Sequence, residues 1–185
     1  IIGMVSRLVA HKGLDLVKGI LDELLATSEV QLVVLGSGDY EYESFFRDIA
    51  AKYPDKVGLR IGFIPDLARK IYAGADMFLM PSKSEPCGLA QMISLRYGTV
   101  PIVRATGGLK DSIMDYGDPS GNGIGFTFQS YNALDMLGAI HRAKEVYNDK
   151  AAWKKLVVKG LNADFTWKRS AQLYIGLYEE LCSWD

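Results

Sequence analysis

Short apolar runs alternate with amphipathic segments along most of the chain. In the first amphipathic segment, Leu14, Val17 and Leu21 recur at the spacing that places side chains on one face of a helix. Strands are predicted at the apolar runs Ile1–Val5, Gln31–Leu35, Val57–Ile64, Asp76–Met80, Val100–Val103 and Gly125–Phe128. Helices are predicted between them at Lys12–Ala26, Tyr40–Lys52, Asp66–Ala73, Gly88–Tyr97 and Gly108–Met114.

This alternation predicts an α/β fold, a doubly wound parallel sheet of the Rossmann-like kind with helices on both faces. Asp115–Gly125 is rich in Gly, Pro, Ser and Asp and is predicted as a surface loop. Three helices are predicted after it, at Ala133–Tyr147, Ala151–Leu161 and Trp167–Cys182. No repeat or linker interrupts the chain, so residues 1–185 are predicted to form a single domain that ends in these helices, about residues 133–185.

Composition and charge exclude several classes of partner. Hydrophobic residues make up 49% of the chain and charged residues 23%, which suits a globular core. The net charge of −1 gives no electrostatic reason to expect nucleic acid or an anionic membrane as partner, and no apolar run approaches the length of about 20 residues that crosses a bilayer. Cys87 and Cys182 form no CxxC pair, so we expect no disulfide framework and no metal site, and we infer a reducing cytoplasm.

Ligands of open parallel sheets bind beyond the carboxyl ends of the strands, so the residues at those ends are the candidates for chemistry. Arg7 and Lys12 follow the first predicted strand on a loop that leads into a helix. Two cations beside the partly positive end of a helix suit a diphosphate. Taken alone, however, an Arg-x4-Lys pair is more typical of a solvated basic loop.

The segment from Glu85 to Leu89 follows the fourth predicted strand and is the most informative passage. Free backbone N–H groups at Gly88 and Leu89 could hold a phosphate. Glu85 could bind sugar hydroxyls or offset positive charge at an oxocarbenium-like transition state, and it could equally cap its own helix. Cys87 could act as a nucleophile, but no histidine lies nearby in the sequence and a small contact residue is the favoured interpretation.

Other strand ends carry weaker signals. Gly36 and Gly38 follow the second strand, and Thr106 and Gly107 follow the fifth. Each glycine could let backbone approach a ligand, but a tight strand-to-helix turn needs glycine just as much. Phe63 ends the third strand and could stack on a nucleobase, although an aromatic residue at a strand end is more often part of the core.

Taken together and in order, these segments resemble the C-terminal domain of bacterial glycogen synthases and plant starch synthases. The resemblance covers nearly the whole chain, and Glu-Pro-Cys-Gly-Leu is its most specific motif. The matching segments are Val5–Leu8, Lys12–Asp15, Val34–Asp39, Ile71–Ser82, Glu85–Leu89, Leu95–Arg104, Thr106–Leu109 and Phe165–Trp167.

The resemblance implies one half of a GT-B glycosyltransferase, the half that binds the sugar nucleotide. It implies transfer of glucose from ADP-glucose to the non-reducing end of an α-1,4-glucan, with retention of configuration, no cofactor and no essential metal. By resemblance, Arg7 and Lys12 would grip the diphosphate and stabilise the leaving ADP, and Glu85 would contact the glucosyl ring.

The resemblance also implies roles for the other candidates. Cys87 would lie beside Glu85, the backbone of Gly88 and Leu89 would bind the distal phosphate, and Phe63 would stack on adenine. The turn residues Gly36, Gly38, Thr106 and Gly107 are assigned with them to the nucleotide-sugar site.

The chain departs from the family pattern at three positions. Phe63 stands where Tyr is frequent, which keeps the ring and loses the hydroxyl. Ala90 replaces a frequent Thr after the Gly-Leu pair, so a hydroxyl contact is lost there while a backbone contact remains. Ile93 stands where related sugar transferases carry a second glutamate, so ribose recognition of that kind is not expected.

The chain opens inside an apolar strand without a lead-in, and we therefore expect a fragment whose N-terminal acceptor domain is absent and which alone synthesises no glucan. Three other functions stay open: a GT-B transferase that uses a UDP-sugar, a non-catalytic nucleotide module or dinucleotide oxidoreductase, and a carbohydrate-binding domain. The scattered Trp153, Trp167 and Trp184 are interpreted as packing residues, which disfavours the carbohydrate-binding domain.

Overall fold

A computed structural model describes residues 1–183, and it contains one parallel sheet in the strand order β3-β2-β1-β4-β5-β6. Trp184 and the predicted domain end at Asp185 lie outside the described residues. The strands are β1 (Ile2–Val5), β2 (Leu32–Gly36), β3 (Val57–Ile61), β4 (Met77–Met80), β5 (Val100–Arg104) and β6 (Phe126–Phe128). All neighbouring strands pair in parallel, which confirms the predicted fold class.

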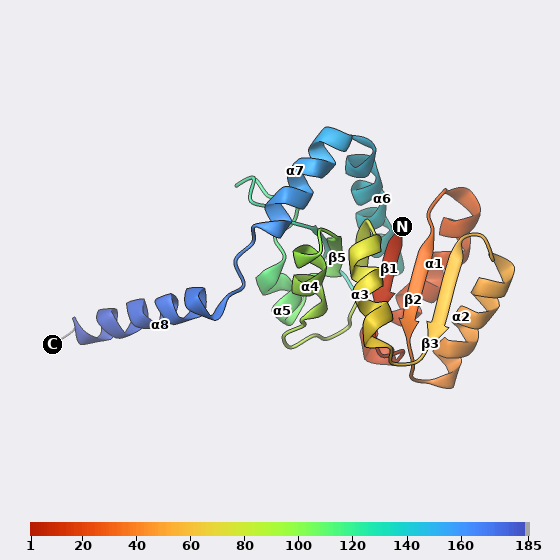
Figure 1. The fold of residues 1–185 in the computed structure, drawn as a ribbon, viewed down its shortest axis with the longest axis horizontal. Helices are drawn as coiled ribbons and strands as arrows, with labels where there is room; N and C mark the ends of the chain where they lie inside the picture. The colour runs from red at the N-terminus through yellow and green to blue at the C-terminus, as the bar shows by residue number, and fades with distance from the viewer. Residues whose placement is uncertain (184–185) are drawn as a thin grey trace.

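Helices connect the strands and complete the chain (Figure 1). The first ones are the short 3-10 helix η1 (Ala10–Lys12), α1 (Leu14–Thr27), α2 (Tyr40–Lys52), α3 (Pro65–Gly74), α4 (Ala90–Arg96) and α5 (Gly107–Ser112). The last ones are α6 (Ala133–Asn148), α7 (Lys150–Leu161) and α8 (Trp167–Cys182). No helix within residues 1–183 has both the length and the apolar character of a membrane span.

Three predicted boundaries are wrong because of a glycine at positive φ. The first helix begins at Leu14 rather than Lys12 because Gly13 has a φ of 75°, and the preceding residues form η1. The fourth begins at Ala90 rather than Gly88, whose φ is 74°. Strand β3 ends at Ile61 rather than Ile64 because Gly62 has a φ of 141°. These are conformations that side chains other than glycine rarely adopt.

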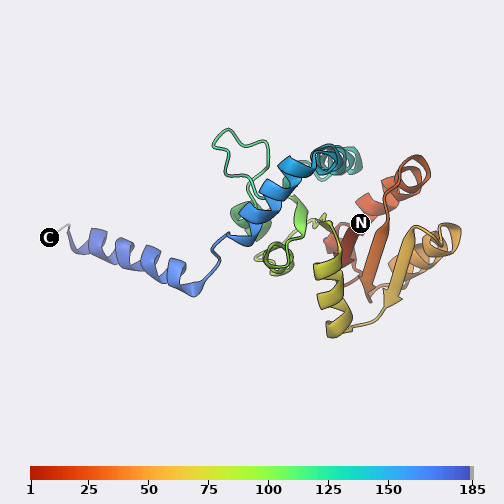
Figure 2. The same ribbon diagram turned by 45° about the horizontal axis from the view of Figure 1, so that its top comes forward.

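Helices cover both faces of the sheet (Figure 2). α1, α2 and α6 pack on one face, over a large core that includes Met4, Val34 and Ile102. α3, α4 and α5 pack on the opposite face, where Val103 and Leu109 belong to a smaller cluster. Residues 102 and 103 therefore serve different cores, as successive side chains on a strand buried on both faces must.

The order of the strands fixes where a ligand can bind. The chain moves outward from β1 through β2 to β3, and then returns to the other side of β1 and moves outward again from β4 to β6. The loops after β1 and β4 therefore leave in opposite directions and open a crevice between them at the carboxyl edge of the sheet.

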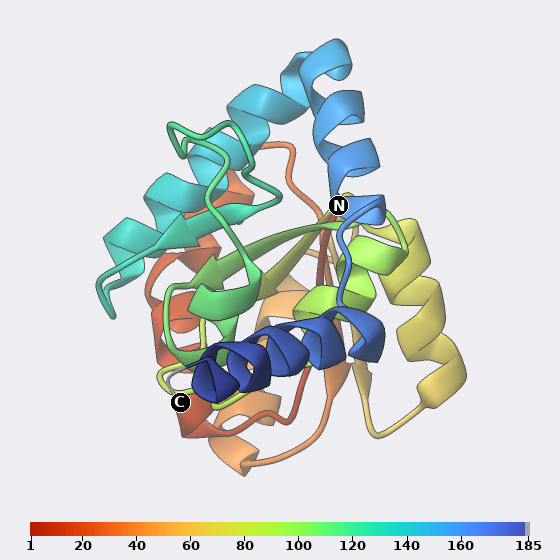
Figure 3. The same cartoon turned by 90° about the vertical axis from the view of Figure 1, so that its left-hand side faces the viewer.

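Helix α8 forms over the predicted range, Trp167–Cys182. It projects from the rest of the molecule (Figure 1), lies in front of the other elements in the view of Figure 3, and buries none of its residues. Trp153 on α7 is buried, as expected for a packing residue, whereas Trp167 at the start of α8 is 88% exposed and that interpretation is wrong.

The two loops of the crevice contact each other through backbone. A Cβ atom on Gly13 would lie 1.9 Å from the carbonyl oxygen of Pro81. Close by, the Lys83 N–H donates a hydrogen bond of 2.9 Å to the carbonyl oxygen of His11. Glycine at position 13 is therefore required twice, for its positive φ and for the space that a side chain would take.

We predict that Gly13→Ala lowers the free energy of unfolding by about 2–4 kcal/mol, because alanine adds backbone strain and a clash with Pro81. The matched control is Gly138→Ala in the exposed middle of α6, where an added Cβ would meet no atom within 4 Å. That control is expected to raise the free energy of unfolding by about 0.5–1 kcal/mol. Urea denaturation checks both variants, and equal stability of the two would contradict the prediction.

Candidate functional site

A cavity of about 180 Å³ occupies the crevice between the loops after β1 and β4. The predicted site residues Arg7, Lys12, Glu85, Gly88 and Leu89 all line it. They come from two loops that are more than seventy residues apart in the chain, and the topology of the sheet brings them together.

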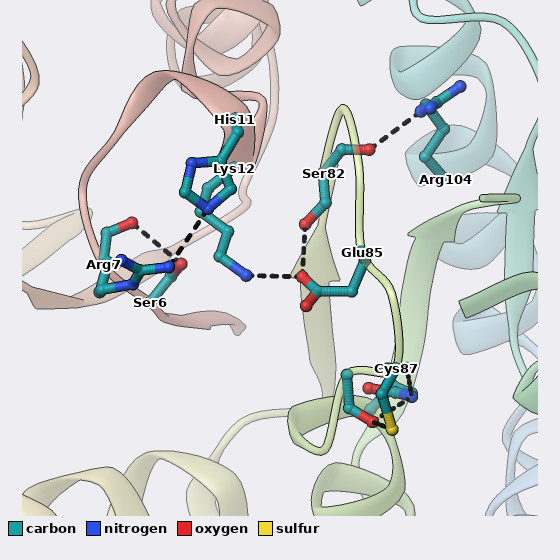
Figure 4. Close-up of polar contacts among 10 residues, drawn as sticks. Ser6, Arg7, His11, Lys12, Ser82, Glu85, Cys87 and Arg104 are labelled. Carbon is teal, nitrogen blue, oxygen red and sulfur yellow. Dashed lines mark hydrogen bonds and ion pairs between the residues drawn. The ribbon is translucent and has the colours of Figure 1, made fainter. Parts of the chain in front are cut away.

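Lys12 and Glu85 meet across this cavity (Figure 4). The Lys12 Nζ lies 2.6 Å from Glu85 Oε2, and the two side chains are only 18% and 11% exposed. The hydroxyl of Ser82 donates a second hydrogen bond, of 3.0 Å, to the same Oε2. Both contacts use one carboxylate oxygen, so Oε1 keeps its capacity to accept a hydrogen bond from a ligand. Glu85 therefore does not cap its own helix through a side-chain bond.

Arg7 lies on the same loop as Lys12 and lines two cavities. Its Nη2 lies 3.3 Å from Nε2 of the exposed His11. The second cavity has a volume of about 250 Å³ and is also lined by Gly36, Phe63 and Ile64. Arg7 thus carries a fixed positive charge at the boundary between the two cavities.

Phe63 is a surface residue and not part of the core. The residue is 90% exposed, and it lines the second cavity together with Arg7 from the loop after β1. An exposed aromatic ring beside an apolar pocket can stack on a planar ligand. The structure thus favours the functional interpretation of Phe63 over the structural one.

Gly36 and Gly38 have different places in the structure. Gly36 lines the second cavity, whereas Gly38 lines neither of the two cavities. A Cβ on Gly38 would lie 2.3 Å from the carbonyl oxygen of Leu8, and the two residues form a parallel bridge. The role of Gly38 is therefore to let the loop after β2 support the loop that carries Arg7.

Thr106 and Gly107 also lie outside the two cavities. Gly107 has a φ of 46°, and a Cβ there would lie 2.2 Å from the carbonyl oxygen of Glu85. The N–H of Gly108 donates a 3.0 Å hydrogen bond to that same carbonyl. This turn supports the Glu85 loop from behind and offers no direct contact to a ligand in the crevice.

Cys87 is exposed, but it faces another cavity. It lines a third cavity together with Phe165 and Arg169, on the side of the loop remote from Lys12. Figure 4 shows the thiol well away from the pair formed by Lys12 and Glu85. The neighbouring backbone reaches the crevice while the Cys87 side chain does not.

Sequence reasoning missed the residues that hold the Glu85 loop in place. Arg104 at the end of β5 donates from Nε to the carbonyl oxygen of Ser82 at 2.9 Å (Figure 4). The ring of Tyr131 lies 5.5 Å from the Arg104 guanidinium and 5.6 Å from the Lys83 ammonium. Burial and a hydrogen bond to Asp15 raise the pKa of Tyr131, so its phenol stays protonated. The sequence did offer one sign of this role, because Arg104 is a positively charged residue at the end of a predicted strand.

Within residues 1–183, the structure contains no cluster of three or more His, Cys, Asp or Glu side chains that could hold a metal ion. The charged groups at the crevice are those of Arg7, Lys12 and Glu85. Two cations and one carboxylate give the site the balance that suits an anionic ligand with a hydroxyl-bearing part.

Comparison with curated proteins finds glycogen synthases. The chain is 52% identical over 181 residues to the glycogen synthase of Bacillus cereus (strain B4264), covering 98% of this chain and 38% of that protein. It is 52% identical over 180 residues to the glycogen synthase of Clostridium novyi, covering 97% of this chain and 37% of the relative. The chain therefore spans less than two fifths of the length of these relatives.

Comparison with solved structures finds synthases as well, a starch synthase among them. The catalytic domain of starch synthase IV from Arabidopsis thaliana, bound to ADP and acarbose, matches with a TM-score of 0.86 and 38% identity over 97% of this chain and 38% of that one. Sucrose-phosphate synthase from Thermosynechococcus elongatus matches with a TM-score of 0.69 at 22% identity, over 100% of this chain and 46% of that one, and shows a common fold.

These identities confirm the resemblance to glycogen and starch synthases that the motifs indicated. The model of the family described as glycosyl transferases group 1 matches residues 1–157, which include the crevice and every candidate residue. The chain belongs to this family of group 1 glycosyl transferases.

Proposed function

We propose that the chain is the donor-binding half of a retaining glucosyltransferase, which transfers glucose from ADP-glucose to the non-reducing end of an α-1,4-glucan. One observation carries the proposal: two cations, a carboxylate and the backbone of Gly88 and Leu89 line one cavity at the switch point of the sheet. The starch synthase structure that is similar to this chain holds ADP and acarbose, which supports the choice of nucleotide and of glucan.

The two cavities fit the two ends of a sugar nucleotide. The second cavity, beside Phe63, would hold the adenosine, with its base on the exposed ring. Arg7, at the boundary, would contact the diphosphate. The first cavity would hold the distal phosphate and the glucose, next to Lys12 and Glu85.

The chemistry follows from these charges. When the bond between the anomeric carbon and the phosphate oxygen breaks, its electron pair goes to the departing ADP and positive charge develops on the sugar ring. Arg7, Lys12 and the N–H groups of Gly88 and Leu89 would stabilise the negative charge on ADP, so the proposal requires no metal. Glu85 Oε1 would accept a hydrogen bond from the sugar and offset its positive charge.

The groups that bind the glucan acceptor belong to the rest of the enzyme in this proposal, because the chain spans only 38% of its glycogen synthase relative. A GT-B architecture, with an N-terminal domain facing this crevice, would supply them. A cytoplasmic location is part of the same proposal and agrees with two free cysteines among the described residues.

We predict that the chain binds ADP more tightly than UDP and does not bind NAD, as isothermal titration calorimetry would measure. Lys12→Met should weaken ADP binding by about tenfold or more, because one charge-assisted contact to the phosphates is lost. Lys155→Met on the exposed face of α7 removes the same charge elsewhere and should leave the affinity unchanged. Preference for UDP would favour a UDP-sugar transferase, and tight binding of NAD would favour an oxidoreductase.

A second prediction concerns Glu85→Gln. The carboxylate is paired with the Lys12 ammonium, so the amide should free that charge and raise the affinity for ADP by several-fold. In the complete enzyme the same change should lower kcat by about 10²–10³-fold, because the sugar loses its negative neighbour. Glu29→Gln, exposed at the opposite edge of the sheet, is the matched control. Weaker ADP binding by Glu85→Gln would contradict this role.

The 185-residue chain alone is predicted to transfer no glucose from ADP-glucose to glycogen, since the acceptor-binding groups lie elsewhere. Incorporation of radiolabelled glucose measures the transfer, with the complete enzyme as positive control. Turnover by the isolated chain would contradict the proposal that acceptor binding belongs to another part of the enzyme.

A further inference from the structure

Gln91 lies in the first turn of α4, directly behind the loop that carries Gly88, and none of its side chain is exposed. Its Nε2 donates to the carbonyl oxygens of Gly88 at 2.9 Å and Cys87 at 3.3 Å. It also lies 3.0 Å from the hydroxyl oxygen of Ser112 on α5. One buried amide group thus joins α4, α5 and the loop that precedes α4.

The orientation of the Gln91 amide follows from its partners. Two of them are carbonyl oxygens, which can only accept hydrogen bonds. The third, the Ser112 hydroxyl, donates its own proton to the carbonyl oxygen of Gly108 at 2.5 Å and so presents its lone pairs to Gln91. If the amide were flipped, its oxygen would face three hydrogen-bond acceptors and could bond to none of them, so the nitrogen must occupy this position.

The other end of the amide is left unpaired. Gln91 Oε1 is buried and has no hydrogen-bond partner among the described residues. Buried polar atoms in native proteins are nearly always paired, and an unpaired one calls for a reason. The hydrogen bonds of this amide are all at the Nε2 end, where two of them act on the loop.

Those bonds determine where the neighbouring N–H groups point. The chain has no cis peptide bond among its described residues, and in a trans peptide the N–H points opposite to the C=O of the same unit. Because the carbonyls of Cys87 and Gly88 point back at Gln91, the N–H groups of Gly88 and Leu89 point away from it, on the side of the crevice that these residues line.

The same packing explains why residue 88 is glycine. Its φ is 74°, and a Cβ there would lie 2.6 Å from Gln91 Oε1. Within residues 1–183, neither Gly88 nor Leu89 donates a backbone hydrogen bond to another protein group. Two unpaired donors therefore face the cavity that also contains Lys12 and Glu85.

We propose that Gln91 is a positioning residue for phosphate recognition: it does not touch the nucleotide, but it holds the peptides of residues 87–89 so that two N–H groups face the distal phosphate. This rests on the proposed function, in which the crevice binds a nucleoside diphosphate. A distal phosphate is the part of ADP that AMP lacks, so Gln91 would contribute to the preference for a diphosphate.

The test is Gln91→Met, which keeps the length of the side chain and removes the donor. ADP and AMP affinities and the thermal midpoint of the nucleotide-free chain are measured together. We expect ADP affinity to fall by about tenfold and AMP affinity to stay within about twofold. Met also leaves the carbonyl oxygens of Cys87 and Gly88 without this donor, so the thermal midpoint should fall even though the unpaired oxygen is gone. A merely structural role predicts instead that the affinities for ADP and AMP fall by equal factors.

Ser112→Ala is the second variant, since it removes one of the three partners and disturbs the core least. It should show a smaller loss of ADP affinity in the same direction. If Gln91→Met keeps the wild-type preference for ADP over AMP, the proposal is overturned.

A readout without nucleotide separates this proposal from the proposed function. If wild-type protein shows no preference for ADP over AMP, the phosphate site itself is wrong. The role of Gln91 in the loop is then decided by the amide NMR signals of Gly88 and Leu89, which should shift in Gln91→Met. Unchanged signals would reject it.

Discussion

The candidate site depends on backbone-to-backbone contact between loops at the carboxyl edge of the sheet. Gly13 lies against Pro81, Gly107 against the carbonyl of Glu85, and Gly38 against Leu8, at distances that leave no room for a Cβ. Loops packed in this way cannot move independently. The charges they carry are therefore held at fixed separations before any ligand arrives, and such preorganisation is what makes electrostatic stabilisation effective.

Lys12 and Glu85 show how the positive charge of a candidate anion site can be balanced within the protein. A half-buried ammonium alone would be costly, and the carboxylate 2.6 Å away offsets that cost. A diphosphate entering the crevice would have to compete with Glu85 for this charge. The pair therefore works against unselective binding of small anions, because the ligand must also satisfy the carboxylate, for example with a sugar hydroxyl.

The periodicity of apolar residues was enough to predict the sheet and its parallel character, and a doubly wound fold brings strand ends to one edge. That Arg7, Lys12 and Glu85 share one site was implied by the resemblance to glycogen and starch synthases, and the three residues do line one cavity. The sequence pattern could not distinguish glycines that line a cavity from glycines, such as Gly107, that support a loop, because both kinds occupy tight turns. Nor could it find the partners of Gln91, which depend on tertiary packing between α4 and α5.

Because helix α8 is exposed, its stability has a different origin from that of the rest of the molecule. Elsewhere, strands and helices share a core, so they unfold together. Over Trp167–Cys182 no residue is buried, and 16 residues is close to the length of about 12–15 residues below which isolated helices are marginal in water. The persistence of this helix is consequently governed by local hydrogen bonds and side-chain propensity, and its melting need not report on the integrity of the sheet at all.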